Sequence, residues 1–509
     1  MLSSIYLATV LLLSISSCFL VYKIIWEQFL SPLRHFPGPI LARFTDIYRA
    51  FAVLPGTIDQ TNIKWHRKYG TAVRIGPNII SISDPSLIKT IYATKNPWRK
   101  VVQSDMYKPN DVVIQGKRVG NLFNTPDAAW HEKYSKPIRN FWTMHKVLEV
   151  EPYIDQTVNA FIQKLGAKFA DKVDEKPICM IDDWLAWFSW DVIANSTFGQ
   201  PYGFLNQERD VQDLIYTSTI GLYYFAIVSQ IPWIDHFLDK NPIIQIGPKP
   251  LFFAAQYAAK AVAEYQQKVS VGEKSGDANH FLARYLKLKD EYPDVVDDNR
   301  IVNYLIGNVS AGGDTTAAIM RAVTYHLAKH PKAYEDLVSE LDSANLALPA
   351  QWKDIRNLPY LDAVIRESMR ISPGISMIFE RVVPHGGFTL PEGRFIPAGT
   401  VVGISPAVTN HDYKIFGHDA DSFNPDRWLR RAKENEEEFD TRRRQMLSVV
   451  DFGFGAGSRI CMGRNLAMLE IWKAIATIYT VFDDPEHKWK CYDAWFVYQW
   501  DMPMVISRR

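Results

Sequence analysis

Residues 454–463 read FGAGSRICMG, and this stretch is the most informative part of the chain. It places a single cysteine, Cys461, after closely spaced glycines that let a backbone turn tightly and come close to a flat ligand. A lone cysteine in an apolar segment is usually a small buried hydrophobe, but that role needs no glycines around it. Gly463 stands where a helix is expected to begin. The N-terminus of a helix favours a thiolate over a thiol, so the stretch predicts a cysteine thiolate that acts as a ligand.

The spacing of five residues in this stretch is more specific than the glycines alone. Phe454, Gly457, Arg459, Cys461 and Gly463 resemble the haem-binding loop of the cytochrome P450 family at every defining position. A cysteine thiolate on haem iron favours cleavage of the O–O bond. The resemblance implies a mainly α P450 fold with small β-sheets, heme b with Cys461 as its axial ligand, and monooxygenase activity.

Two further segments resemble the family in the expected order along the chain. Residues 367–370 read ESMR, and residues 423–428 read FNPDRW. Residues three apart share one face of a helix, so Glu367 and Arg370 can pair. By resemblance, Glu367, Arg370 and Arg427 form a buried charged triad that holds the haem-loop side together.

Residues 311–316 read AGGDTT within a long predicted helix. Each of two adjacent glycines in a helix interior costs about 1 kcal/mol against alanine. We therefore expect the helix to pass close to a ligand at this point. The segment resembles the acid–alcohol pair of the family on the distal face of the haem, and the resemblance implies that Asp314 and Thr315 deliver protons there.

The resemblance extends over residues 36–509, and filamentous-fungal microsomal enzymes of the pisatin demethylase type are the most similar members. Arg381 and Arg459 stand where the family places arginines that bind the haem propionates. The chain departs from the family in an early helix, where Trp130 is followed four residues later by Tyr134 rather than by arginine. The resemblance places Trp130 among the haem-binding residues, and the candidates to replace the propionate contact of the missing arginine are Lys133, Lys136 and His131.

The chain is predicted to have an N-terminal membrane anchor over residues 1–26, a proline-rich hinge over 27–40 and one catalytic domain over 41–509. Residues 1–22 carry no charged side chain. At about 1.5 Å per residue, such a helix matches a hydrocarbon core of roughly 30 Å. The alternative is a cleaved signal peptide, which would need a basic N-terminal region that is missing here. The basic residues that follow favour a cytosolic C-terminal side, so the prediction is a single-pass protein of the endoplasmic reticulum membrane.

Composition excludes several other classes of protein. The chain has 509 residues and a net charge of +1, which gives no strong attraction for nucleic acid. Its four cysteines are far apart and form no close pair, so neither a disulfide framework nor a zinc site is expected.

Residue patterns also predict individual elements. We expect a hairpin over residues 73–82, a short helix over 84–91, the longest helix over 297–330, a second hairpin over 381–402, a solvated charge-dense loop or helix over 431–444, and a final helix over 463–481.

Monooxygenation consumes electrons. A separate protein has to deliver them, because the chain has no flavin or nucleotide motif. The resemblance implies NADPH-cytochrome P450 reductase as the donor, with cytochrome b5 as a further candidate, and basic residues such as Lys136, Arg139 and 442–444 could attract an acidic partner. By analogy, the substrate is a sizeable hydrophobic molecule. The segments expected around it are the loop at 100–125 and residues 216–237, 303–310, 375–379 and 495–500.

Two other functions fit a haem-binding chain. One is a haem-thiolate isomerase or dehydratase, and the other is a haem-binding sensor without turnover. The intact Asp314–Thr315 pair favours monooxygenation, and a dependence on NADPH, reductase and oxygen would separate the three.

Overall fold

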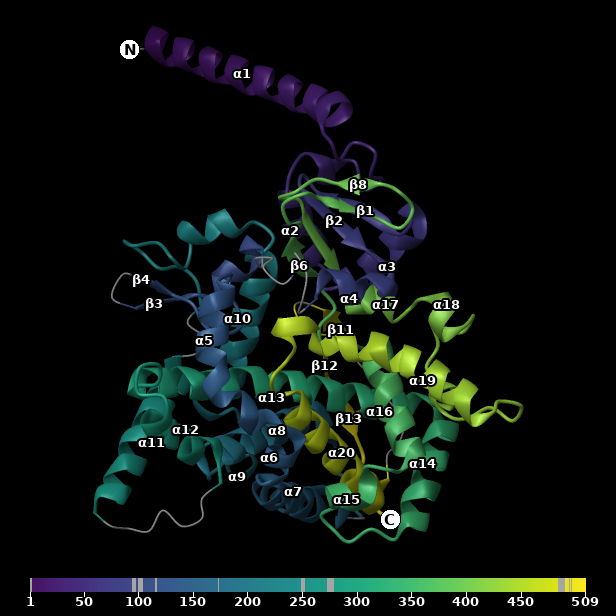
Figure 1. Ribbon diagram of the computed structural model, residues 1–509. Helices are drawn as coiled ribbons and strands as arrows, with labels where there is room; N and C mark the ends of the chain where they lie inside the picture. The colour runs from purple at the N-terminus through teal and green to yellow at the C-terminus, as the bar shows by residue number, and fades with distance from the viewer. Residues whose placement is uncertain are drawn as a thin grey trace.

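The chain is mainly helical with small β-sheets, as the sequence predicts. The computed structural model describes residues 2–93, 98, 104–114, 117–172, 174–248, 252–271, 279–483, 490–493, 495 and 497–509. A long helix, α13, crosses the middle of the molecule, other helices surround it, and a small sheet lies toward the N-terminal end (Figure 1).

The largest sheet has four strands in the order β1-β2-β9-β6. Their bounds are β1 Ala72–Gly76, β2 Ile79–Ile82, β6 Phe379–Val382 and β9 Val401–Ile404. β1 and β2 form the predicted antiparallel hairpin, β2 pairs parallel with β9, and β6 pairs antiparallel with β9. The predicted hairpin over 381–402 is therefore confirmed, with the short pair β7 Phe388–Thr389 and β8 Phe395–Ile396 inside it.

Four helices form the centre of the core: α8 Ile181–Phe198, α13 Asp298–Lys329, α16 Pro359–Ile371 and α20 Arg464–Val481. α13 packs against the other three, and most extensively against α8. Asp297 caps the start of α13 by accepting a hydrogen bond from the backbone N–H of Arg300 at 2.7 Å. The predictions of the longest helix and of the final helix are both confirmed.

The other elements surround this core. The α-helices are α2 Ile47–Val53, α3 Ile58–Tyr69, α4 Ile88–Ile91, α5 Ala128–Arg139, α6 Met144–Leu148, α7 Glu151–Leu165, α9 Phe204–Gln207, α10 Leu214–Val228, α11 Phe252–Ser270, α12 Phe281–Glu291, α14 Pro331–Ala344, α15 Trp352–Ile355, α17 Pro406–Thr409, α18 Tyr413–Phe416 and α19 Glu436–Val450. The short strands are β3 Val112–Ile114, β4 Lys117–Val119, β5 Cys179–Met180, β10 Phe482–Asp483, β11 Lys490–Asp493, β12 Val497–Trp500, β13 Pro503–Met504 and β14 Ser507–Arg508.

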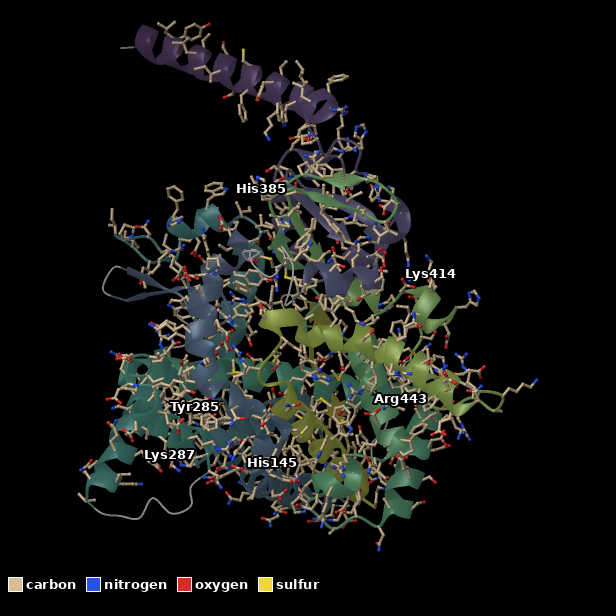
Figure 2. All side chains as sticks on the ribbon, in the orientation of Figure 1. His145, Tyr285, Lys287, His385, Lys414 and Arg443 are labelled. Atoms are coloured by element: carbon tan, nitrogen blue, oxygen red, sulfur yellow. The ribbon has the colours of Figure 1, made fainter. Side chains whose placement is uncertain are left out.

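Much of the charge-dense segment over 431–444 is helical, because it leads into α19. Asn435 and Glu438 form a capping box at the start of this helix. Arg442 pairs with Glu434, and Arg443, which lies on α19, pairs with Asp362 of α16 at 2.8 Å (Figure 2). Two of the three consecutive arginines thus form ion pairs within the chain, and the third, Arg444, donates a hydrogen bond to the carbonyl of Asp440 at 3.1 Å.

The first helix, α1, spans Leu2–Ile25, points away from the body of the molecule, and continues into a single π-helical turn over Trp26–Leu30 (Figure 1). Within the part of the chain that the structure describes, no helix is long and apolar enough to cross a membrane. The transmembrane helix predicted over residues 1–26 is therefore not supported by the structure.

The segment after α1, predicted as a hinge, is packed against β1. Glu27 is buried and accepts a hydrogen bond from Nη2 of Arg74 at 2.6 Å. The backbone N–H of Arg74 donates to the carbonyl of Pro37 at 2.8 Å. A Cβ on Gly38 would lie 2.0 Å from the carbonyl oxygen of Arg74, so the two backbones approach as closely as only glycine allows. The helical turn ends at Leu30, within the segment predicted as a proline-rich hinge.

Candidate active site

The loop before α20 holds Cys461 through backbone contacts that require two of its glycines. Gly455 and Gly457 have φ values of 75° and 67°, which favour glycine. A Cβ on Gly457 would lie 1.9 Å from the carbonyl oxygen of Tyr92. The backbone N–H of Cys461 donates to the carbonyl of Phe454 at 2.7 Å, which closes the loop.

The environment of the Cys461 sulfur fits a ligand of a metal ion. Burial among protein atoms raises the pKa of the thiol, while hydrogen bonds from the backbone N–H groups of Gly463 and Arg464 lower it. These donors lie at the start of α20, as predicted, but burial outweighs them. A thiolate here therefore needs a cation as its partner, which haem iron would provide. Although many protein atoms surround the sulfur, Cys461 keeps an exposed surface.

Arg381 and Arg459 lie near each other and suit the propionates of a haem. Burial and the like charge of Arg381 lower the pKa of Arg459 to about 10. Nη1 of Arg459 donates to the carbonyl of Leu122 at 3.4 Å, and Nη1 of Arg381 donates to the carbonyl of Glu380 at 2.8 Å. Two adjacent, largely buried cations are stabilised by an anion between them, so the pair fits the role that the resemblance implies.

Of the residues on the early helix, His131 is the one that the structure brings to Arg459. It is buried, and this burial together with the charge of Arg459 lowers its pKa to about 4, which favours the neutral imidazole near pH 7. Lys133 is exposed, with Nζ 5.3 Å from the ring of Tyr134. The centroids of the Trp130 and Tyr134 rings lie 4.5 Å apart with their planes tilted by 47°, and Arg300 of α13 lies 4.0 Å from the Tyr134 ring and 5.1 Å from the Trp130 ring.

Thr315 lies on an accessible face of α13 with two small residues. Gly307, Ala311 and Thr315 are spaced by four, so they share this face. The Thr315 hydroxyl donates to the carbonyl of Ala311 at 2.7 Å. This face of the helix is open, as expected for the side toward a ligand.

Asp314 faces a different environment from Thr315. Its side chain is buried; Oδ1 accepts a hydrogen bond from Nε1 of Trp190 at 3.0 Å, and Oδ2 accepts one from Oγ of Ser218 at 2.6 Å. Burial raises the pKa of this carboxyl group. The two residues of the predicted pair are therefore adjacent in sequence, but Asp314 points into the protein interior and Thr315 lies on the open face of α13. The sequence analysis missed both Trp190 and Ser218.

Gly312 and Gly313 of α13 have a different structural role from the one expected. A Cβ on Gly312 would lie 2.7 Å from the side chain of Ile193, and a Cβ on Gly313 would lie 2.5 Å from the Trp190 ring. Both neighbours belong to α8. The glycines therefore allow α8 to pack closely on α13, and the expectation that they make room for a ligand is corrected.

This packing gives a prediction for Gly313→Ala. The added methyl group would overlap the Trp190 ring, so we expect a loss of about 1–3 kcal/mol in the free energy of unfolding. Gly307→Ala is the control, because its Cβ would meet no protein atom within 4 Å. Thermal or denaturant unfolding of the two proteins would measure the difference, and equal stability would contradict the packing role of Gly313.

The charged triad predicted from the sequence is present and buried. Glu367 accepts hydrogen bonds from Nη2 of Arg370 at 2.8 Å, from Nε of Arg427 at 2.9 Å and from Nε1 of Trp428 at 2.9 Å. Arg370 also donates to the backbone carbonyls of Asn410, Ala420 and Ser422. Glu367 and Arg370 are 0% exposed. The triad thus links α16 to the segment before α19.

Four of the five segments expected around the substrate meet in one apolar cluster. Its aromatic members include Tyr107, Phe225 and Trp495, and Met377 packs with them. The half-exposed ring of Phe123 contacts all three aromatic rings with centroid distances of 5.5–6.1 Å. Residues 100–103, 115–116 and 496 of the expected segments lie outside the described residues.

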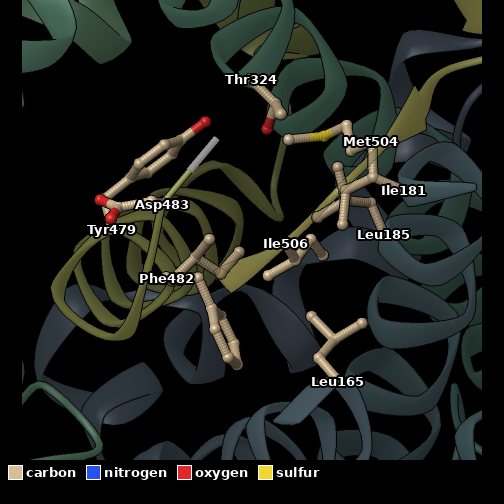
Figure 3. A pocket seen from close by; sticks show the side chains of 10 residues that line it. Leu165, Ile181, Leu185, Thr324, Tyr479, Phe482, Asp483, Met504 and Ile506 are labelled. Carbon is tan, nitrogen blue, oxygen red and sulfur yellow. The ribbon is translucent and has the colours of Figure 1, made fainter. Parts of the chain in front are cut away.

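A small cavity lies away from this cluster, between α8, α20 and the C-terminal strands. Its volume is about 20 Å³, and its lining includes Thr324, Tyr479 and Ile506 (Figure 3). This space is of the size of a single water molecule, so it is a packing gap and not a substrate site.

Comparison with known proteins agrees with the motifs and the geometry. The family model described as Cytochrome P450 matches residues 50–484. This chain belongs to the cytochrome P450 family. A cytochrome P450 monooxygenase of Aspergillus candidus, cfoH, is 36% identical over 99% of this chain and 94% of its own length. The monooxygenase cicH of Emericella nidulans is 34% identical over 91% of this chain and 92% of its own length.

This P450 is therefore an oxidoreductase with fungal relatives. The residues that would hold haem are Cys461 at the iron and Arg381, Arg459 and His131 at the propionates. Haem bound in this way supplies the activation of dioxygen. The protein would supply the thiolate and the charges that fix the cofactor, and the family resemblance implies that Asp314 and Thr315 of α13 would move protons.

Proposed function

We propose that this P450 inserts one oxygen atom from O2 into a hydrophobic small molecule of fungal secondary metabolism. The observation that carries the proposal is the Cys461 loop, whose sulfur receives two backbone N–H groups at the start of α20. The intact pair of Asp314 and Thr315 supports monooxygenation over the isomerase and sensor alternatives. The fungal relatives named as monooxygenases and the aromatic cluster support the substrate class.

The experiment begins with the natural substrate. A strain that lacks the gene should accumulate a compound that the wild type converts, and this compound would be incubated with the purified holoenzyme, reductase, NADPH and oxygen-18 gas. We expect a product that carries one labelled oxygen atom. A product without label that forms in the absence of NADPH would instead indicate an isomerase or dehydratase, and binding without any product would indicate a sensor.

Thr315→Ala should uncouple this reaction. Thr315 lies on the open face of α13, where its hydroxyl can hold a water molecule and direct protons. Without it, we expect the yield of product per NADPH to fall by at least about tenfold, with the missing electrons recovered as hydrogen peroxide. Product, peroxide and NADPH would be measured together, and haem content should stay normal.

Thr324→Ala is the matched control for that variant. Thr324 lies on the same helix and makes the same hydrogen bond to the carbonyl four residues earlier, at 3.0 Å, but it is buried. It should keep the wild-type yield of product. A wild-type yield from Thr315→Ala as well would show that this P450 obtains its protons by another path.

We propose NADPH-cytochrome P450 reductase as the electron donor, with cytochrome b5 as an additional partner. The side chains of Lys136 and Arg444 are exposed, which supports attraction of an acidic partner. The charge of Arg139, in contrast, is paired with Glu132 at 2.9 Å. Titration of salt against the rate of reduction tests the charge attraction, which should weaken as ionic strength rises.

We propose that the protein is located at the endoplasmic reticulum membrane, with the catalytic domain on the cytosolic side. The uncharged run over residues 1–22 and the exposed apolar side chains of α1, such as Leu7, Leu11, Ile15 and Phe19, support membrane attachment. Alkaline carbonate washing of microsomes separates the possibilities: a single-pass anchor should remain in the pellet, and release of the full-length protein would contradict it.

A further inference from the structure

Both oxygen atoms of the Asp314 carboxyl group are held by donors far away in the sequence. Trp190 of α8 donates to Oδ1 at 3.0 Å, and Ser218 of α10 donates to Oδ2 at 2.6 Å. Trp190 is 0% exposed, Asp314 4% and Ser218 5%. Because each carboxyl oxygen has its own donor in a buried place, the side chain is fixed in one orientation.

The two donors are held in different ways. Trp190 is packed on Gly313, where no Cβ would fit, so its indole is part of the rigid contact between α8 and α13. Ser218 depends on the position of α10. That helix starts after Gln212 and Asp213, which have φ values of 56° and 52°, unusual for residues other than glycine.

The start of α10 is also fixed by a cap. The Asp210 carboxylate accepts hydrogen bonds from the backbone N–H groups of Ile215 at 3.0 Å and Tyr216 at 2.9 Å. The cap and the two left-handed residues set the register of α10, and the register sets where the Ser218 hydroxyl points. A hydroxyl both donates and accepts, so Ser218 is suited to contact an acid that exchanges protons.

We propose that Ser218 is a positioning residue for Asp314 in proton delivery, so that α10 as well as α13 sets the rate at which protons reach the Thr315 face. This inference rests on the proposed monooxygenase function. The Trp190 indole fixes one carboxyl oxygen permanently, and the Ser218 hydroxyl fixes the other. A shift of α10 changes the second contact alone.

The test uses the substrate-free holoenzyme with reductase, NADPH and oxygen, since oxygen reduction needs protons even without an organic substrate. In Ser218→Ala we expect the rate of NADPH oxidation to fall about fivefold, as for the loss of one hydrogen bond. The kinetic solvent isotope effect should rise, because proton delivery becomes more rate-limiting. Ser218→Thr keeps the hydroxyl and should restore both values.

A double-mutant cycle with Asp314→Asn separates positioning from a general structural effect. If Ser218 acts through Asp314, adding Ser218→Ala to Asp314→Asn should cause no further fall in rate. The matched control is Thr217→Ala on the same helix, whose hydroxyl bonds to the carbonyl of Asp213 at 2.8 Å and should not affect the rate. Haem content and the spectrum of the reduced carbonyl complex should match the wild type in every variant.

Three results would overturn the inference. The rate could be unchanged in Ser218→Ala, the effects of the two substitutions could multiply, or the fall in rate could be matched by an equal loss of haem. Wild-type holoenzyme that oxidises no NADPH at all would contradict the proposed function itself, and the role of Ser218 with it.

Discussion

Replacing Cys461 with alanine will abolish the thiolate-type absorption of the reduced carbonyl complex and all oxygenation. Cys461 is the only cysteine in the FGAGSRICMG loop, and its sulfur is the atom to which the backbone N–H groups of Gly463 and Arg464 are directed. Alanine offers no ligand to the iron, so haem content should fall steeply as well. The measurement is the spectrum of the purified, reduced protein under carbon monoxide, together with the haem content per chain.

Cys179→Ala is the control for that result. Unlike Cys461, Cys179 is a buried residue, in β5, and burial raises the pKa of its thiol, so it is an unreactive part of the core. The spectrum of this variant should match the wild type. If Cys461→Ala kept the thiolate-type absorption, Cys461 would not be the axial ligand.

Replacing Glu367 with glutamine will cause the largest loss of stability of any single change to a charged residue considered above. Glutamine has almost the same shape but no charge, so the guanidinium groups of Arg370 and Arg427 would lose the carboxylate between them. Removing one partner of a buried ion pair costs about 3–5 kcal/mol. We expect most of the protein to be insoluble or free of haem at growth temperature, and the soluble remainder to unfold at a much lower temperature.

A surface ion pair provides the comparison. Lys260 and Glu264 of α11 lie 3.6 Å apart, and their side chains are 74% and 51% exposed. Glu264→Gln should therefore leave the midpoint of thermal unfolding nearly unchanged, because water screens such a pair. Similar losses in both variants would show that the Glu367 triad contributes no more than a pair on the surface.

The elements that the sequence predicted correctly are those whose signals are local. The hairpin of β1 and β2 has a turn between two apolar runs, and α13 has a capping residue, Asp297, at one end and Pro331 beyond the other. The cysteine loop and the charged triad were also predicted, because their residues occur at fixed spacings that resemble the family. In each case a short stretch of chain carries the information.

The features that were missed depend on contacts between distant segments. The glycine pair of α13 is explained only by Trp190 and Ile193, more than a hundred residues earlier in the chain. The orientation of Asp314 depends on Ser218 in α10. The spacing of residues in one helix gives the face on which a side chain lies, but it does not tell which residue of another segment packs against that face.

The early helix shows the same limit at a finer scale. The sequence offers Lys133, Lys136 and His131 for the propionate contact, but Lys133 lies on the exposed side of α5, whereas His131, two residues earlier in the same turn, lies on the buried side. Successive residues of a helix project about 100° apart, so a shift of two positions moves a side chain to the opposite side. Charge alone could not decide between these positions.

The buried contact between Glu27 and Arg74 gives the first helix the mechanics of a lever arm. Because the turn over Trp26–Leu30 continues α1 and is fastened to β1, a tilt of the helix is passed to the sheet and is not absorbed by the connection. The rotation of α1 about its own axis is then fixed relative to the sheet, as its length is fixed by its sequence. Inserting one residue between α1 and Glu27 would rotate the whole helix by about 100° about its axis relative to the catalytic domain. A helix from another protein that replaced α1 would therefore need the same number of residues before Glu27 to present the same face.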